Sequence, residues 1–375
     1  MNELKYKALY EFLMRDIMSG KYNAENPIPS IKALMMRFGL SKNTVLRTLD
    51  ELKSQGLISR SQGRASTVTK LAAARKIGLI VPGIVVSEFF RPVVTTLIRL
   101  AQENGYTILF GETYSHDPVE RVREARDLAA TMIKNHIAGV LYQPFEATLN
   151  GQEMNQRILS VLDAKKIPVV LIDRDTVMPP ERTMHDLVAI NNVDAGERIT
   201  RHMALAGARH IAFLTKYSDV PNIECRLRGF HCTQMAFEHK GVQFQVLRVA
   251  ADDVAFFRRK MRGRSRPDAI VCDSDTTAAV LLQTLNRIGC AVPDDVLVSG
   301  FDDVGLATLT TPQLTTIHQP CTAIAEWAFC RLLERIAHPR QVPAEILLQA
   351  PLVVRASTSR ECEGKKGIRG RRKCK

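Results

Sequence analysis

The chain has 375 residues, and its apolar fraction of 45% and charged fraction of 24% are ordinary for a soluble globular protein. It is too long for one ordinary core, and no apolar run reaches the ~18 residues that a membrane-spanning helix needs. The first twenty residues carry charges throughout and lack a signal-peptide core, so we expect a cytoplasmic protein without membrane contact. The eight cysteines are scattered, which argues against a disulfide framework or a metal knuckle.

The net charge of +13 is concentrated at the two ends of the chain. Residues 1–76 hold 14 Lys and Arg against 6 Asp and Glu, residues 361–375 hold 7 against 2, and the segment between holds 31 of each. A basic module ahead of a neutral one suggests that the small part meets a polyanion. The basic tail, 361–375, predicts disorder; it either adds non-specific attraction to phosphates or is a solvated tail without a role.

Three helices and a hairpin are predicted in the opening module. Apolar residues at helical spacing predict a first helix from Tyr6 to Ser19. Ser30 is expected to cap a second helix, Gly39 to form the turn after it, and Ser41 to cap a third. After the third helix, the segment "LISRSQGRASTVT" predicts two short strands around a Gln-Gly-Arg tip, which has the form of a wing.

The third helix places short hydroxyl and amide groups together with cations near its exposed N-terminal end. A helix docked in the major groove uses these groups for phosphates and base edges, and a wing reaches phosphates or the minor groove. A solvated helical surface is the alternative interpretation. The residues expected to contact DNA are Ser30, Lys32, Ser41, Lys42, Asn43, Thr44 and Arg47 on the helices, and Gln62, Gly63 and Arg64 at the wing tip.

This module resembles the GntR-type winged helix-turn-helix. The matching stretches are "PS", "LSKNTV", "ELKSQGLI" and "QGR". Lys32 and Lys42 stand where that family usually carries Arg, and Leu46 replaces a third Arg. The resemblance implies binding to double-stranded DNA, but these replacements prevent an operator sequence from being carried over.

From residue 77 onward, short apolar strands alternate with longer helical stretches. We expect strands at "KIGLIV", "YTILFG", "IAGVLYQP", "IPVVLID", "HIAFLT", "QFQVLRV", "PDAIVCD" and "VLVSGFD". Helices are expected at 93–104, 118–135, 154–165, 195–206, 224–240 and 276–288. This alternation predicts an α/β fold whose parallel sheets are covered by helices on both faces.

Polar residues at the ends of these strands are the candidates for a ligand site, because ligands of such sheets bind at the carboxyl ends of strands. Asp173 and Asp302 follow two of the strands, and Arg226 opens the motif "RLRGF". Carboxylates and an Arg can hold sugar hydroxyls, while an aromatic residue such as Phe89 or Phe90 covers the ring. The aspartates at 275 and 303 could equally be helix or turn caps.

Residues 76 to about 360 resemble the effector domain of the LacI/GalR repressor family, which has the fold of periplasmic sugar-binding proteins. The matching stretches include "RLRGF", "VCDSDTTAAVLLQTLNRIGCAVPDDVLVSGFDD" and "PQLTTIHQP". Ser274 stands where the family has an Asn, so this position lacks the amide donor of the family. The residues that the resemblance assigns to effector binding are Phe90, Gln143, Asp173, Arg226, Ser274 and Asp302.

The two resemblances together divide the chain. They imply a winged helix-turn-helix over 1–69, a linker over 70–76 and a two-subdomain effector and dimerisation domain over 77–360. The chain is expected to cross between the subdomains near 190, 318 and 346. This combination of modules is a known arrangement in sugar-utilisation repressors.

Three classes of function are compatible with these modules. A homodimeric transcriptional repressor that binds a palindromic operator and senses a sugar uses both modules and needs no cofactor. A cytoplasmic solute-binding receptor would leave the basic head without a role, and a ligand-activated regulator would bind DNA more tightly with ligand than without it. An enzyme is not supported, because no nucleophile elbow, phosphate-binding loop, dinucleotide fingerprint or HExxH motif occurs.

Overall fold

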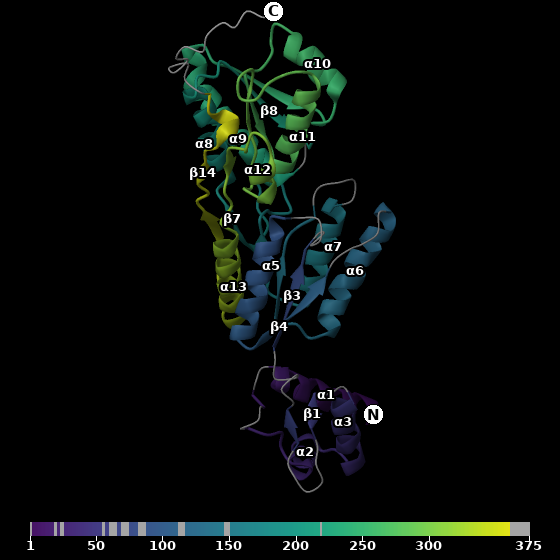
Figure 1. The fold of residues 1–375 in the computed structure, drawn as a ribbon. Helices are drawn as coiled ribbons and strands as arrows, with labels where there is room; N and C mark the ends of the chain where they lie inside the picture. Colours follow the sequence, from purple (N-terminus) through teal and green to yellow (C-terminus); the bar gives the residue numbers. More distant parts are fainter. Residues whose placement is uncertain are drawn as a thin grey trace, which may run out of the picture.

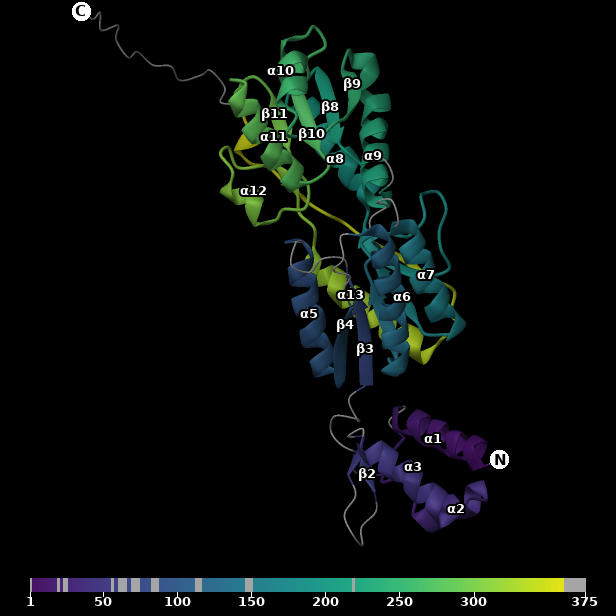
Figure 2. The same ribbon diagram turned by 90° about the vertical axis from the view of Figure 1, so that its right-hand side faces the viewer.

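The structure, a computed structural model, describes residues 2–18, 21–22, 26–54, 57–59, 66–68, 75–81, 88–111, 117–145, 151–217 and 220–360. It contains a small N-terminal head and two larger α/β subdomains (Figure 1). In two perpendicular views the head lies at the end of the first subdomain that is remote from the second (Figure 2). No helix within the described ranges is long and apolar enough to cross a membrane.

The head consists of three helices and a two-stranded antiparallel hairpin. Its elements are α1 (Asn2–Met18), α2 (Ile31–Phe38), α3 (Lys42–Ser54), β1 (Ile58–Ser59) and β2 (Thr67–Val68). Ser30 caps α2 by accepting a hydrogen bond from the Ala33 amide at 3.2 Å, and Gly39 ends this helix in the left-handed region at φ 61°. Ser41 Oγ accepts from the Thr44 amide at 3.3 Å, as expected for the cap of α3.

An apolar core joins the three helices of the head. Buried side chains recur every three or four residues along α1 and α3, which is the spacing that places them on one face. The main contributors are Leu9, Leu13 and Ile17 of α1, Leu34 of α2, and Val45, Leu49 and Leu52 of α3. The predicted first helix was placed four residues too late at its start, since α1 begins at Asn2.

The first subdomain is built on a six-stranded parallel sheet in the order β13-β7-β6-β5-β3-β4. The strands are β3 (Arg75–Ile80), β4 (Tyr106–Gly111), β5 (Gly139–Tyr142), β6 (Val169–Ile172), β7 (Asp186–Ile190) and β13 (Glu345–Leu348). The helices are α5 (Phe90–Glu103), α6 (Pro118–Lys134), α7 (Gly151–Ala164) and α13 (Cys321–Ala337). β3 starts at Arg75, within the predicted linker, because Arg75 and Lys76 already pair with β4.

Alternate residues of β3 enter two different cores of this subdomain. Ile77 and Leu79 pack with α5 and α13, whereas Ile80 packs with α6 and α7. Helices therefore cover both faces of the sheet (Figure 1), as the alternation of strands and helices in the sequence predicts.

The second subdomain has a four-stranded parallel sheet in the order β11-β10-β8-β9. Its strands are β8 (His210–Thr215), β9 (Gln243–Arg248), β10 (Ala269–Cys272) and β11 (Leu297–Ser299). Its helices are α8 (Asn192–Leu205), α9 (Pro221–Phe237), α10 (Val254–Arg262), α11 (Asp275–Arg287), α12 (Gly305–Leu309) and the 3-10 turns η1 (Glu238–Lys240) and η2 (Ala356–Thr358). α8 and α9 share one core with the sheet, and α10 and α11 share the other.

The chain passes between the two subdomains three times. It leaves the first subdomain after β7, returns between β12 (Thr316–Ile317) and α13, and leaves again between β13 and β14 (Leu352–Val353). β12 and β14 pair with each other in antiparallel fashion. The strand and helix patterns did not predict β7, β12, β13, β14, α10, α12 or α13.

Candidate functional site

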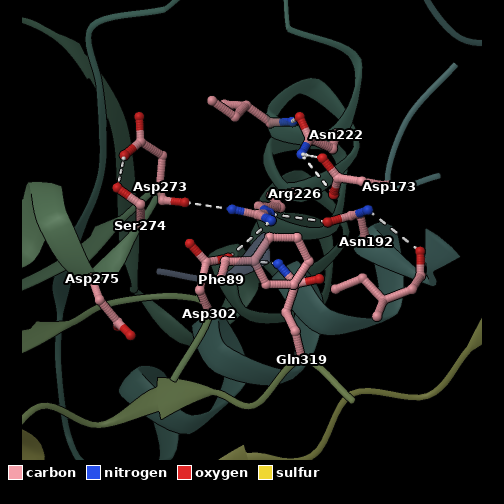
Figure 3. A network of polar contacts seen from close by, with 12 residues as sticks. Phe89, Asp173, Asn192, Asn222, Arg226, Asp273, Ser274, Asp275, Asp302 and Gln319 are labelled. Carbon is pink, nitrogen blue, oxygen red and sulfur yellow. Dashed lines mark hydrogen bonds and ion pairs between the residues drawn. The ribbon is translucent and has the colours of Figure 1, made fainter. Parts of the chain in front are cut away.

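A group of polar side chains, all buried except the half-buried Asp302, lies where the two subdomains meet (Figure 3). Each member follows a strand or opens a helix at the carboxyl end of one of the two sheets, or lies on a crossing segment, so the fold itself brings them together. We name the group the junction cluster; it comprises Gln143, Asp173, Asn192, Asn222, Arg226, Asp273, Asp302 and Gln319.

Arg226 on α9 is the centre of the junction cluster. Its guanidinium is 4% exposed and donates to Asn192 Oδ1 at 2.9 Å, to the Asp273 carbonyl at 2.6 Å and to Asp302 Oδ1 at 3.4 Å. Its Cζ lies 3.5 Å from the centroid of the Phe301 ring, which covers one face of the guanidinium. These contacts on three sides and one face hold the guanidinium in a defined orientation.

Asp173 forms one of the contacts between the first subdomain and the second. It directly follows β6 and has φ 73°, a left-handed conformation that Asp adopts more readily than most residues. Its carboxylate accepts from Gln143 Nε2 at 3.3 Å and from Arg174 Nε at 3.0 Å within its own subdomain. It also accepts from Asn222 Nδ2 at 3.3 Å, and Asn222 lies on α9 of the second subdomain.

Asp302 lies in an environment that disfavours its ionised form. The pKa of Asp302 is raised to about 6, first by burial and then by the charges of Asp173 and Asp273, while Arg226 and a hydrogen bond from Gln319 Nε2 at 2.6 Å oppose the increase. The residue has φ 109°, so the backbone presents the carboxyl group to the cluster in a strained conformation.

Two of the residues predicted to bind the effector, Phe90 and Ser274, are not members of the junction cluster. Phe90 is 1% exposed and packs in the core under α5, while its neighbour Phe89 is half-buried and lies in front of the cluster in Figure 3. Ser274 caps α11 through the Thr277 amide at 3.2 Å and also donates to Asp273 Oδ1 at 3.2 Å. Phe89 is therefore the better candidate for an aromatic contact to a ligand.

Asp275 and Asp303 have structural partners, which favours the capping interpretation for both. Asp275 is completely buried and accepts from Thr316 Oγ1 at 2.7 Å and from the Val304 amide at 3.0 Å. Burial and the nearby charge of Asp302 raise its pKa to about 7, although the two hydrogen bonds lower it. Asp303 forms ion pairs with Arg355 at 2.6 Å and with His318 at 2.9 Å.

The sequence analysis missed Asn192, Asn222, Asp273 and Gln319. Asp273 ends the predicted strand "PDAIVCD", so its position at a strand end was the signal that could have identified it. Asn192 and Gln319 lie on crossing segments, and Asn222 lies one turn before Arg226 on α9. Helical spacing from Arg226 would have indicated Asn222.

The residues predicted to contact DNA form two groups on the head. Ser30, Lys32, Ser41, Lys42 and Asn43 are exposed, and Thr44 is half-buried. Arg47 is exposed but its guanidinium stacks on the Tyr6 ring of α1 at 5.0 Å from the centroid, beside a shallow surface hollow that Asn43 and Leu46 also line. Gln62, Gly63 and Arg64 lie outside the described residues.

Comparison with protein families assigns both modules. Residues 5–68 match the bacterial regulatory proteins of the gntR family, and residues 200–358 match the periplasmic binding protein-like domain.

Curated relatives extend over nearly the whole chain. The arabinose metabolism transcriptional repressor of Geobacillus stearothermophilus is 28% identical over 367 residues, covering 94% of this chain and 97% of its own. The ribose operon repressor of Escherichia coli K12 is 27% identical over 294 residues, covering 77% of this chain and 83% of its own.

Among solved structures, a transcriptional regulator CelR in complex with cellobiose is similar with a TM-score of 0.63. It is 20% identical, and the alignment covers 88% of this chain and all of that chain. At this identity the likeness concerns the fold.

Proposed function

We propose that the chain is a cytoplasmic, homodimeric transcriptional repressor, and not an enzyme, that binds a palindromic operator; the proposal is supported by the match of its two modules to the gntR family and to the periplasmic binding protein-like domain. A sugar bound at the junction cluster controls its affinity for the operator. The observation that carries the proposal is the convergence of strand-end polar groups from both subdomains on Arg226 and Asp173.

The head supports contact with DNA through the start of α3. Lys42 and Asn43 are exposed in its first turn, where a recognition helix reaches phosphates and base edges. The basic excess of residues 1–76 adds attraction to the phosphate backbone, so operator binding should weaken as salt increases.

The junction cluster supports a hydroxylated ligand. Carboxylates and side-chain amides accept and donate hydrogen bonds at closely spaced positions, which matches the adjacent hydroxyls of a sugar, and Phe89 offers an aromatic face for the ring. The names of the relatives, which refer to arabinose metabolism and a ribose operon, and the structure with cellobiose support the same class of ligand.

Coupling follows from the position of the cluster between the two subdomains. A ligand that contacts Asp173 and Arg226 together favours one relative orientation of the subdomains, and two heads in a dimer need a fixed spacing to occupy both half-sites. Couplings of about 1–3 kcal/mol, or roughly 5–150-fold in affinity, are typical of such regulation.

Phe110 on the edge strand β4 and Trp327 on α13 are 42% and 50% exposed, which supports an apolar contact between protomers on the first subdomain.

The test is a selection of bound sequences from a random double-stranded DNA library with the full-length chain. We expect a short palindrome, and a two-fold stoichiometry of protein to site. Lys42→Ala and Asn43→Ala should weaken operator binding and leave sugar binding unchanged, whereas Arg226→Ala should lose the sugar response and keep DNA binding.

Three outcomes separate the alternatives. Sugar binding without any enriched DNA sequence would indicate a solute-binding receptor and would overturn the proposal. Tighter DNA binding in the presence of sugar would indicate a ligand-activated regulator. Release of DNA by sugar would support the inducible repressor.

A further inference from the structure

Helix α10 of the second subdomain and the turn that follows it carry an excess of positive charge. Residues 254–267 contain six Lys and Arg and no Asp or Glu, although residues 77–360 as a whole hold equal numbers of both signs. Lys260 is half-buried, and the other five cations are exposed. We name these five the distal patch; it comprises Arg258, Arg259, Arg262, Arg264 and Arg266.

The arginines of the distal patch form no ion pair with any carboxylate that the structure describes. Exposed arginines on other helices do, since Arg157 pairs with Glu153 and Arg201 pairs with Glu197, both at 2.7 Å. Like charges three or four residues apart on a helix repel each other and lower its stability. The distal patch therefore destabilises α10 until an anion neutralises it, which points to a binding surface.

The turn at 263–266 is held against the edge strand β9. Gln245 Oε1 on β9 accepts from Lys260 Nζ at 2.6 Å, and Gln245 Nε2 donates to the Ser265 carbonyl at 3.3 Å. Lys260 Nζ also lies 3.5 Å from Ser265 Oγ. The arginines of the turn therefore extend from a backbone of defined shape.

The distal patch and the head lie at opposite ends of the molecule. In both views α10 lies at the end of the second subdomain that is remote from the head (Figure 1, Figure 2). The topology agrees, because the turn leads into the amino end of β10, whereas the junction cluster lies at the carboxyl ends of the strands. The stretch of duplex bound by the head therefore cannot contact the distal patch, since both subdomains lie between them.

The chemistry of the distal patch fits phosphate groups. Guanidinium groups bind phosphate oxygens in a bidentate manner, and five of them within nine residues match the closely spaced charges of a nucleic-acid backbone. The large apolar side chains of α10 are not exposed, since Phe257 and Met261 are buried and Phe256 is half-buried. The core of a protein interface and a membrane-binding helix both need exposed apolar groups. A phosphate backbone is therefore favoured over a protein or a membrane.

We propose that the distal patch binds the phosphate backbone of a second segment of double-stranded DNA, without regard to its sequence. A protein whose head occupies an operator then holds two duplex segments, one at each end. Duplex DNA is the partner because the head brings the protein to it, which places other segments of the same DNA at a high local concentration. Bridging of two segments rests on the proposed function, whereas binding by the distal patch alone does not.

The experiment measures the capture of a second duplex by protein that is already bound to its operator. A short selected operator is fixed to a surface, the full-length protein is bound to saturation, and a fluorescent duplex of unrelated sequence is added at several salt concentrations. We expect the second duplex to bind with a dissociation constant of about 10⁻⁴–10⁻⁶ M, and to bind more weakly as salt increases.

Two triple variants that lose the same charge are compared. The patch variant carries Arg262→Gln, Arg264→Gln and Arg266→Gln. The control variant removes exposed arginines of α6, α7 and α8 that lie outside the head and the distal patch, by Arg123→Gln, Arg157→Gln and Arg201→Gln.

The patch variant should lose capture and keep operator binding. We expect its affinity for the second duplex to fall by about tenfold or more, and the slope of log affinity against log salt to decrease by about 2–3, because three phosphate contacts are lost. The control variant should behave like the wild type. Equal capture by the patch variant and the wild type would overturn the proposal.

Three further outcomes identify another binder or another partner. Capture that is lost when residues 361–375 are deleted, but is kept in the patch variant, would assign the binding to the basic tail and overturn the proposal. If the arginines of the distal patch bind poly-L-glutamate more tightly than the duplex, the partner is an acidic polypeptide. If they bind vesicles of equal parts phosphatidylcholine and phosphatidylglycerol more tightly, the partner is a membrane. Both results would overturn the proposal.

Failure of the proposed function can be told apart from failure of this inference. If the selection yields no operator sequence, the proposed function fails. Binding of the two triple variants to the unrelated duplex in free solution then still tests the distal patch. Weaker binding of the patch variant than of the control variant would support the inference, and equal binding would overturn it.

Discussion

Asn222 Nδ2 lies 3.3 Å from Asp173 Oδ1 and 3.4 Å from Asp173 Oδ2, so one side-chain amide contacts both carboxylate oxygens across the boundary between the subdomains. Asn222 lies on α9 and Asp173 follows β6. The two subdomains thus touch through a pair of polar groups that a ligand can also address.

Asn222→Asp should weaken the sugar response by placing two carboxylates against each other. Two negative charges at this separation in a buried site repel strongly, and the separation of the subdomains should increase. We expect a lower affinity for the effector and a larger radius of gyration in X-ray scattering. Asn286→Asp, on α11 away from the junction, is the control. Unchanged affinity in the Asn222 variant would argue against a ligand held between the subdomains.

Arg47 should contribute less to operator binding than Lys42, although both are exposed cations on α3. The Arg47 guanidinium is already stacked on Tyr6, whereas Lys42 lies in the first turn of the helix. Arg47→Ala should therefore lower thermal stability more than operator affinity, and Lys42→Ala should do the reverse. Fluorescence anisotropy with the selected operator measures the affinity of both variants, and thermal unfolding measures their stability. Equal losses of operator affinity in the two variants would indicate that Arg47 contacts DNA as Lys42 does.

Asp275 should make stability decrease as pH rises. Its pKa is about 7 in the folded chain and ordinary in the unfolded chain, so the folded state holds the extra proton between about pH 4 and pH 7. The stabilisation is complete below this window and is lost as pH rises through about 7. Asp275→Asn cannot lose this proton, so its melting temperature relative to that of the wild type should increase from pH 4.5 to pH 8. Parallel profiles would contradict the assignment.

Asp186 should be the most costly carboxylate to replace in the first subdomain. It is 1% exposed and accepts from Arg331 Nε at 2.9 Å, from Arg335 Nε at 2.7 Å and from the Ala344 amide at 2.7 Å. Burial opposes its ionisation, but the hydrogen bonds from Arg335, Ala344 and Arg331 hold the pKa of Asp186 below its ordinary value. Its contribution to stability is therefore present above that ordinary value and is lost as pH falls.

Replacement by Asn leaves two buried guanidinium groups without their carboxylate. Asp186→Asn should lower the free energy of unfolding by about 3–5 kcal/mol. Asp163→Asn removes an exposed carboxylate that pairs with His185, and should cost about 0–1 kcal/mol. Denaturant unfolding measures both, and similar values for the two variants would show that the buried network adds little.

Gly196 should be required for the position of Arg226. A Cβ at Gly196 would lie 2.2 Å from the Arg226 carbonyl oxygen, because α8 and α9 approach closely at this point. Gly196→Ala should displace α9, lower stability by about 1–3 kcal/mol and weaken effector binding. Gly263→Ala, where the nearest atom would be 3.4 Å away, is the control. Full sugar affinity in the Gly196 variant would mean that α9 can shift without harm to the site.

The fold was largely predictable because strands and helices alternate with distinct periodicities. Buried parallel strands appear as short apolar runs, and each of the eight predicted strands has a counterpart in the structure. The pairing of β13 with β7 was not visible in the pattern, since the two strands are separated by all of the second subdomain. Local periodicity carries no information about partners so far apart in the chain.

The site was predictable only where a strand end or a motif marks it. Asp173, Arg226 and Asp302 were identified in this way, and the structure places them together. Phe90 was chosen over Phe89, and this choice shows how far a motif alone can identify a site residue. Adjacent residues on a helix point about 100° apart, so the rotation of α5 about its axis decides which of the two enters the core. Asn222 and Gln319 gain their positions from the meeting of two subdomains, which no local pattern describes.

The triple passage of the chain between subdomains also constrains how the protein is made. α13 and β13 complete the first subdomain, yet they follow the whole second sheet in the sequence. Domains usually fold as units in order of synthesis. Here more than 150 residues are synthesised between β7 and its partner strand β13, so the edge of β7 stays unpaired during that time. The second subdomain is also incomplete until β14 and η2 have been added. Neither subdomain can therefore complete its fold on the ribosome until the residues after 320 have been synthesised. A nascent chain that ends at residue 320 would leave the edge of β7 unpaired, and it would expose the apolar face that α13 covers.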